Sequence, residues 1–112
     1  MIRTVRCYDK DYKFQFVRHT YTNNNSTAIE ILLPDEGEVW SVLSTNVYPW
    51  ELKQDEIAVS RGDENEEWTK AVLEQTNLFE NTHMTIRMNY GNYEVWKIKQ
   101  EIPEFSREVS QD

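Results

Sequence analysis

The stretch that most constrains the fold of this chain is 37–46, which reads Gly-Glu-Val-Trp-Ser-Val-Leu-Ser-Thr-Asn. Gly37 is well placed for the positive φ that closes a short hairpin loop, and Pro34 opens that loop. The stretch therefore predicts a strand over 38–45 that pairs antiparallel with a strand over 27–33. Strict alternation puts Trp40 and Val42 on one face and Val39 on the other. Because both faces carry apolar residues, we expect this strand to be internal to the sheet.

Further strands follow from residues that alternate between apolar and polar. The pattern around Phe14 and Phe16 predicts a strand near 12–22, and Ile57 lies in a brief strand. The alternation around Met84 and Ile86 predicts a C-terminal hairpin with a return strand that contains Trp96. Residues 1–8 read as an edge strand or a loose arm, and the polar run 101–112 as a frayed tail.

One helix is predicted over about 64–76. Asp63 is a suitable N-cap, and Glu66 three positions later completes a capping box. Trp68, Ala71 and Val72 fall on one face of this helix and should pack on the sheet. With 112 residues, one domain is expected. The fold class is therefore α+β: a single domain with an antiparallel sheet from an N-terminal meander and a C-terminal hairpin, and one helix that covers a face of the sheet.

Composition favours a cytoplasmic protein. Cys7 is the one cysteine of the chain, so it cannot form an internal disulfide or a cysteine-based zinc site. No apolar run is long enough for a membrane helix, and no apolar stretch follows a basic N-terminus. We expect a protein that is neither exported by that route nor membrane-spanning.

The candidates for catalysis are Cys7, His19 and His83. None lies in a recognisable motif, and a buried thiol and two ordinary strand histidines explain them better. The two histidines lack a spaced partner for metal binding, and no glycine-rich phosphate loop is present. We expect no enzymatic activity and no cofactor.

Charge is the strongest functional signal. The net charge is −8, yet residues 1–20 hold five basic residues against two acidic ones, whereas residues 51–80 hold nine acidic against three basic. This polarity argues against direct nucleic-acid binding, which requires clustered Lys and Arg, and favours a basic partner. The acidic array comprises Asp55, Glu56, Asp63, Glu64, Glu66, Glu67 and Glu74. Such carboxylates can imitate phosphates, although a charge run is more often a solvated helix face.

Two aromatic residues, Tyr48 and Trp50, flank Pro49 in the loop after the strand over 38–45. Exposed aromatics dominate binding hot spots, so this pair could anchor a partner. The alternative is that both rings fold back as a lid on the core, because large aromatics bury readily.

The chain resembles a domain-of-unknown-function family of small acidic proteins encoded by phages, plasmids and conjugative elements. The resemblance covers about residues 20–99, and its most recognisable parts are Gly37-Glu38, Thr45-Asn46 and Glu66-Glu67-Trp68. The chain departs from the commoner pattern in the Tyr48-Pro49-Trp50 loop and in its charged tail. The family has no established catalytic residues to carry over.

Its setting in mobile elements implies a role in countering host defence, for example by inhibiting a CRISPR nuclease or a restriction enzyme. Together with the charge, this implies a non-enzymatic inhibitor that binds a basic, nucleic-acid-handling enzyme through the acidic array and the Tyr48/Trp50 loop. The alternative is a structural or accessory module that self-associates, as a homodimer, through sheet edges and the same loop. A small enzyme that uses Cys7 is the third reading.

Overall fold

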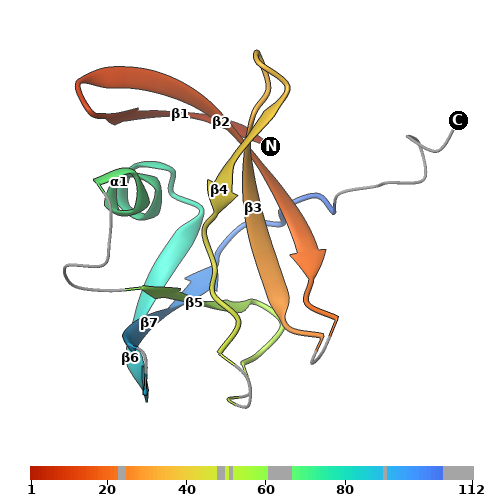
Figure 1. Ribbon diagram of the computed structural model, residues 1–112, viewed down its shortest axis with the longest axis vertical. Helices are drawn as coiled ribbons and strands as arrows, with labels where there is room; N and C mark the ends of the chain where they lie inside the picture. The colour runs from red at the N-terminus through yellow and green to blue at the C-terminus, as the bar shows by residue number, and fades with distance from the viewer. Residues whose placement is uncertain (23–24, 48–49, 51, 61–66, 90, 105–112) are drawn as a thin grey trace, which may run out of the picture.

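The computed structural model describes residues 1–22, 25–47, 50, 52–60, 67–89 and 91–104. Within these residues the chain forms seven strands and one helix (Figure 1). In order they are β1 (Ile2–Cys7), β2 (Lys10–Thr20), β3 (Thr27–Leu33), β4 (Glu38–Val42), β5 (Glu56–Ser60), α1 (Glu67–Gln75), β6 (Phe79–Met88) and β7 (Gly91–Ile98).

The strands form two antiparallel sheets. The N-terminal meander gives one sheet in the order β1-β2-β3-β4, and the second has the order β5-β7-β6, so that β5 joins the C-terminal hairpin. The prediction of an α+β fold with one helix is confirmed for the described part of the chain. The meander and the C-terminal hairpin form two sheets rather than the expected one, because the hairpin pairs with β5 and not with the meander. The alternation that predicted the strand over 27–33 matches β3 at both ends.

The segment after β4 connects the two sheets. The N–H of Leu43 donates to the carbonyl of Ile29 in β3 at 2.8 Å, and the N–H of Thr45 donates to Ala58 in β5, also at 2.8 Å. Between them, the buried Ser44 hydroxyl accepts a hydrogen bond from the N–H of Ile29 at 3.0 Å. A side chain thus satisfies a strand donor at the point where the backbone leaves one sheet for the other.

Helix α1 packs against β1 and β6, the edge strands of the two sheets (Figure 1). Trp68, Ala71 and Val72 are buried, as the helical spacing predicts. The Trp68 ring lies edge-on to that of Trp40, with 6.2 Å between the ring centroids. The helix therefore closes the gap between the sheets over an aromatic core. Within the described residues, no helix has the length and apolar character that a membrane span requires.

The prediction that the strand over 38–45 is internal is wrong, because β4 lies at the edge of its sheet and ends at Val42. A bulge explains the difference. Ile31 pairs with Ser41 but Leu32 pairs with Val39, which leaves Trp40 as the extra residue of β4. The bulge breaks the alternation, so Trp40 packs against the core while Val39 and Val42 are 58% and 46% exposed.

The two ends of the chain also refine the prediction. Residues 1–8 contain an edge strand, β1, which was one of the two alternatives. The predicted start of the frayed tail, at residue 101, is too early. Ile102 is 1% exposed, and the carbonyl of Pro103 accepts a hydrogen bond from the N–H of Arg18 at 2.9 Å. Residues 105–112 lie outside the described residues, as does the predicted capping box of Asp63 and Glu66.

Candidate protein-binding surfaces

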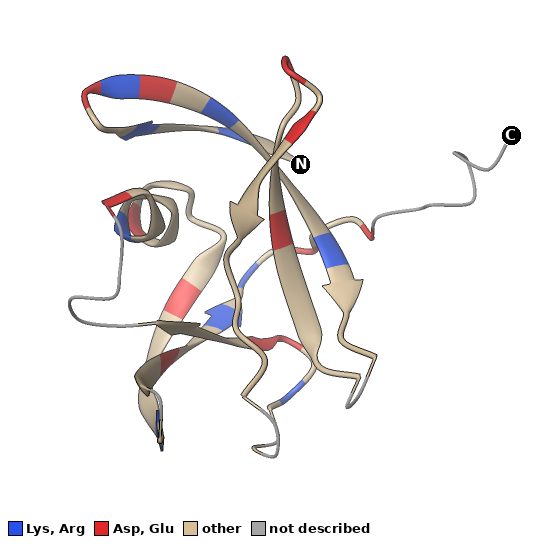
Figure 2. Ribbon diagram, viewed as in Figure 1, with Lys and Arg blue, Asp and Glu red and all other residues tan. Residues whose placement is uncertain are grey.

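The predicted acidic array does not form one surface in the described residues. Figure 2 shows the acidic positions along α1 well apart from those at the start of β5. Three further members, Asp63, Glu64 and Glu66, lie outside the part of the chain that the structure describes. For the described members, closeness in the sequence does not mean closeness in the fold.

Most of the described carboxylates in the array have partners within the chain. The Asp55 carboxylate lies 3.8 Å from Lys97, and the Glu56 carboxylate accepts a hydrogen bond from the N–H of Lys53 at 3.0 Å. Glu67 accepts one from the N–H of Tyr8 at 2.6 Å. Glu74 is the exception, since it is exposed and has no hydrogen bond or ion pair within the described residues. Three of these four predicted contact residues thus contribute to the fold.

Glu67 belongs to a feature that the sequence did not reveal, which we name the β1 clamp: Glu67 and Gln75 of α1 bound to the backbone of β1 and its turn. The Gln75 side chain accepts a hydrogen bond from the N–H of Arg6 and donates one to the carbonyl of Arg6, both at 2.9 Å. A side-chain amide therefore occupies the place of a neighbouring strand. Because unpaired strand edges template association, the clamp protects the β1 edge.

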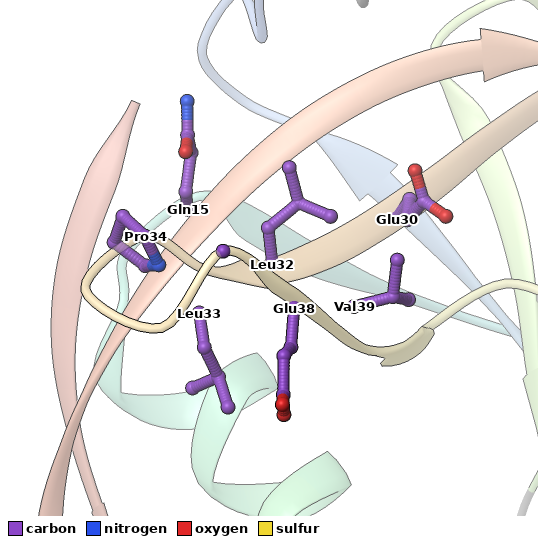
Figure 3. A pocket seen from close by; sticks show the side chains of 8 residues that line it. Gln15, Glu30, Leu32, Leu33, Pro34, Glu38 and Val39 are labelled. Carbon is purple, nitrogen blue, oxygen red and sulfur yellow. The ribbon is translucent and has the colours of Figure 1, made fainter.

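The other edge of this sheet carries what we name the β4 edge surface: Glu30, Leu32, Glu38, Val39 and Val42. Leu32 pairs with Val39 and Glu30 with Val42, so the four lie on one face of neighbouring strands. Figure 3 shows Leu32, Glu30 and Val39 on one side of the sheet and Glu38 on the other, towards α1.

A groove of about 350 Å³ follows this end of the β3–β4 hairpin. Its lining includes two carboxylates and four apolar side chains but no Lys or Arg: Gln15, Glu30, Leu32, Leu33, Pro34, Gly37, Glu38 and Val39. The groove is therefore apolar with acidic margins. This composition suits a ligand that is itself part apolar and part cationic.

The three candidates for catalysis have separate surroundings. Cys7 is buried, and burial and then the nearby Glu67 carboxylate raise the pKa of its thiol. The His19 ring lies 2.8 Å from the Glu30 carboxylate. His83 is exposed in the β6 bulge with a φ of 64°. A buried thiol with a raised pKa is a poor nucleophile. No group of three or more His, Cys, Asp and Glu residues in the described chain could hold a metal ion.

The structure tests the two alternatives for the Tyr48/Trp50 loop, anchor or lid, at Trp50 alone. Trp50 is 52% exposed, so it does not pack as a lid, whereas Tyr48 lies outside the described residues. The N–H of Trp50 donates to the carbonyl of Val47 at 2.9 Å, and Val47 is itself buried. This hydrogen bond fixes the Trp50 backbone beside a buried residue, while its indole stays available to a partner.

These features define, over the described residues, a small α+β protein with two antiparallel sheets and a sheet edge at β4 without a neighbouring strand. Comparisons with protein-family models, with curated proteins and with solved structures found no match.

Proposed function

We propose that this protein is a non-enzymatic inhibitor that binds a basic, nucleic-acid-handling enzyme. One observation carries the proposal: seven of the ten Lys and Arg side chains in the described residues have a partner inside the chain, while several exposed carboxylates have none. Cations with an ion pair, hydrogen bond or ring contact inside the chain are Arg3, Arg6, Lys10, Lys13, Arg18, Lys97 and Lys99. Exposed carboxylates without a partner in the described chain include Glu36, Glu38, Glu74 and Glu80.

This imbalance gives the surface a negative field that matches the net charge of −8. Such a field speeds encounter with a basic partner and opposes encounter with nucleic acid. The enzyme classes that the proposal names are a CRISPR nuclease and a restriction enzyme, in line with the resemblance to proteins of phages, plasmids and conjugative elements. The buried thiol of Cys7 and the engaged His19 support a role without catalysis.

The test measures binding to a purified CRISPR nuclease and to a purified restriction enzyme, each with a parallel DNA-cleavage assay. We expect binding to one of them, inhibition of its cleavage, and an affinity that falls steeply as salt is raised, because salt screens exposed charges. The double charge reversal Glu36→Lys/Glu38→Lys, the single reversal Glu74→Lys and the control Glu80→Lys locate the contact. Glu80 lies on β6, away from the β4 edge surface.

Binding that ignores salt, or equal affinity for all three variants and the parent, would contradict an acidic contact surface. Failure to bind or inhibit any member of either enzyme class would contradict the inhibitor role itself. Loss of binding in Glu80→Lys alone would move the contact to the β6 side.

A self-associating module is the second candidate, and the open β4 edge favours it. Val39 and Val42 of β4 are exposed, and β4 has no described neighbour on its outer side. Sedimentation over a range of protein concentrations separates the two candidates. A dimer that forms without any basic partner and dissociates on Val42→Lys supports self-association, whereas a monomer at all concentrations excludes it.

A further inference from the structure

We propose that the outer edge of β4 accepts an extended segment of the basic partner as an added strand, with apolar side chains on one face and cationic side chains on the other. This inference rests on the proposed function, because it specifies where and in what form the partner binds. Added strands gain affinity from backbone hydrogen bonds and specificity from alternate side chains.

The first argument is that the other described edges are covered or interrupted. The β1 clamp binds the backbone of β1 at Arg6, and Thr45 forms a bridge with Ala58 of β5. Glu104 pairs with Arg18, within the stretch of β2 that β1 does not cover. The edge of β6 is broken by the bulge between Asn81 and Met84. Both β4 and β6 carry a bulge, but in the described residues β6 presents the exposed cation Arg87 where β4 presents the carboxylate of Glu38, so β4 is the edge that suits a basic segment.

The second argument is the direction of the backbone groups. In an antiparallel pair, successive residues point their N–H and C=O alternately towards and away from the partner strand. The N–H of Leu43 donates to Ile29 of β3. The N–H of the preceding residue, Val42, therefore points away from β3, towards the open edge. It is positioned to donate to an incoming strand.

The third argument is that the exposed side chains of β4 suit those of a strand that alternates apolar and basic residues. A strand beside β4 would place alternate side chains against exposed Val39 and Val42 on one face. Its other side chains would lie on the face that carries Glu38, whose carboxylate is exposed and unpaired in the described structure. Since the groove contains no Lys or Arg, cationic side chains would meet no repulsion within it. A segment that alternates apolar and basic residues fits both faces.

The probe is the synthetic peptide Lys-Val-Lys-Val-Lys-Val-Lys, with Glu-Val-Glu-Val-Glu-Val-Glu as its charge-reversed control. Backbone amide shifts of the full chain are followed by NMR during titration. We expect shifts centred on β4 with the lysine peptide and none with the glutamate peptide. Val42→Pro removes the outward N–H and should weaken binding about tenfold. Val39→Lys, which adds a cation instead, tests the site without altering the backbone, and Met84→Lys on β6 is the matched control.

Shifts centred on another element, equal binding of both peptides, or full affinity in both Val42→Pro and Val39→Lys would overturn the inference. Absence of any lysine-peptide binding would overturn it as well. If a nuclease or restriction enzyme still binds and is inhibited in those cases, the proposed function stands and the docking site lies elsewhere. Self-association through β4 without peptide would identify a second copy of the chain as the occupant and would also overturn it.

Discussion

The two edges of the four-stranded sheet differ in how they end. At β1, the side chains of Glu67 and Gln75 bind the backbone of Tyr8 and Arg6, so α1 stands in for a further strand. At β4, no described strand lies on the outer side, and Val39 and Val42 remain exposed. One sheet thus has a closed edge and an open edge.

The difference shows that edge protection in this protein is selective. Helix α1 contacts the aromatic core beneath β4 through Trp68 and Trp40, yet its polar clamp residues bind only at β1. A chain of this size could have covered or charged both edges, as soluble proteins commonly do. The exposed valines of β4 are the observation on which the proposed strand addition rests.

The largest expected effect on stability comes from truncating Trp68, the buried aromatic residue of α1. Trp68→Ala should lower the free energy of unfolding by about 3–5 kcal/mol, because a buried aromatic side chain is replaced by a cavity. The control Trp50→Ala removes an equally large but exposed indole and should change it by less than about 0.5 kcal/mol. Urea denaturation measures both. Similar losses in the two variants would contradict the described burial.

The next effect concerns the closed edge directly. Gln75→Ala removes both hydrogen bonds to Arg6 and should cost about 1–2 kcal/mol of stability. Amide hydrogen exchange at Arg6 should also accelerate. The neighbouring variant Glu74→Ala removes an exposed side chain without a described partner and should leave both quantities nearly unchanged. An unaltered exchange rate in Gln75→Ala would show that the clamp does not protect β1.

The ionisation and reactivity of the buried Cys7 thiol in β1 test the same edge. Because burial and then Glu67 raise the pKa of Cys7 above its usual 9.0, the folded state keeps this proton to a higher pH than the unfolded state. Stability should therefore decline as pH rises above that value, and the decline should be shallower in Cys7→Ala. At neutral pH the thiol should react slowly with a disulfide reagent and faster in Trp68→Ala. Rapid reaction in the native parent would contradict a closed β1 edge.

The smallest effect is expected at the open edge. Val39→Lys should change the free energy of unfolding by less than about 0.5 kcal/mol, because the side chain is already exposed. Denaturation of Val39→Lys and Val42→Lys beside the parent checks this. A loss above about 1 kcal/mol would mean that the β4 valines contribute to the core.

Much of the fold was predictable because local patterns dominate it. The alternation in β3 and the helical spacing of Trp68, Ala71 and Val72 predicted which residues are buried, because that burial follows from the period of the strand or helix. The position of β4 was not predictable in this way. Apolar residues on both faces normally indicate burial on both, and nothing in the local pattern marks Trp40 as a bulge residue.

The candidate site was harder to predict because it depends on long-range contacts. Glu67 reads as one of a run of carboxylates, but its hydrogen bond reaches a backbone group from the start of the chain. The burial of Ile102 likewise depends on a distant strand. Residue type and spacing predicted an acidic protein with a basic partner, but they could not show which carboxylates the fold had already used.

The perpendicular packing of Trp40 and Trp68 also gives the protein an intrinsic fluorescence probe of this contact. One indole belongs to the bulge of β4 and the other to α1, and the Nε1 of Trp40 is buried without a described hydrogen-bond partner. Emission from this pair should lie at shorter wavelength than that of the exposed Trp50 and should move to the red when water reaches the two rings. Fluorescence would then register any event at β4 that separates the strand from the helix, without a label.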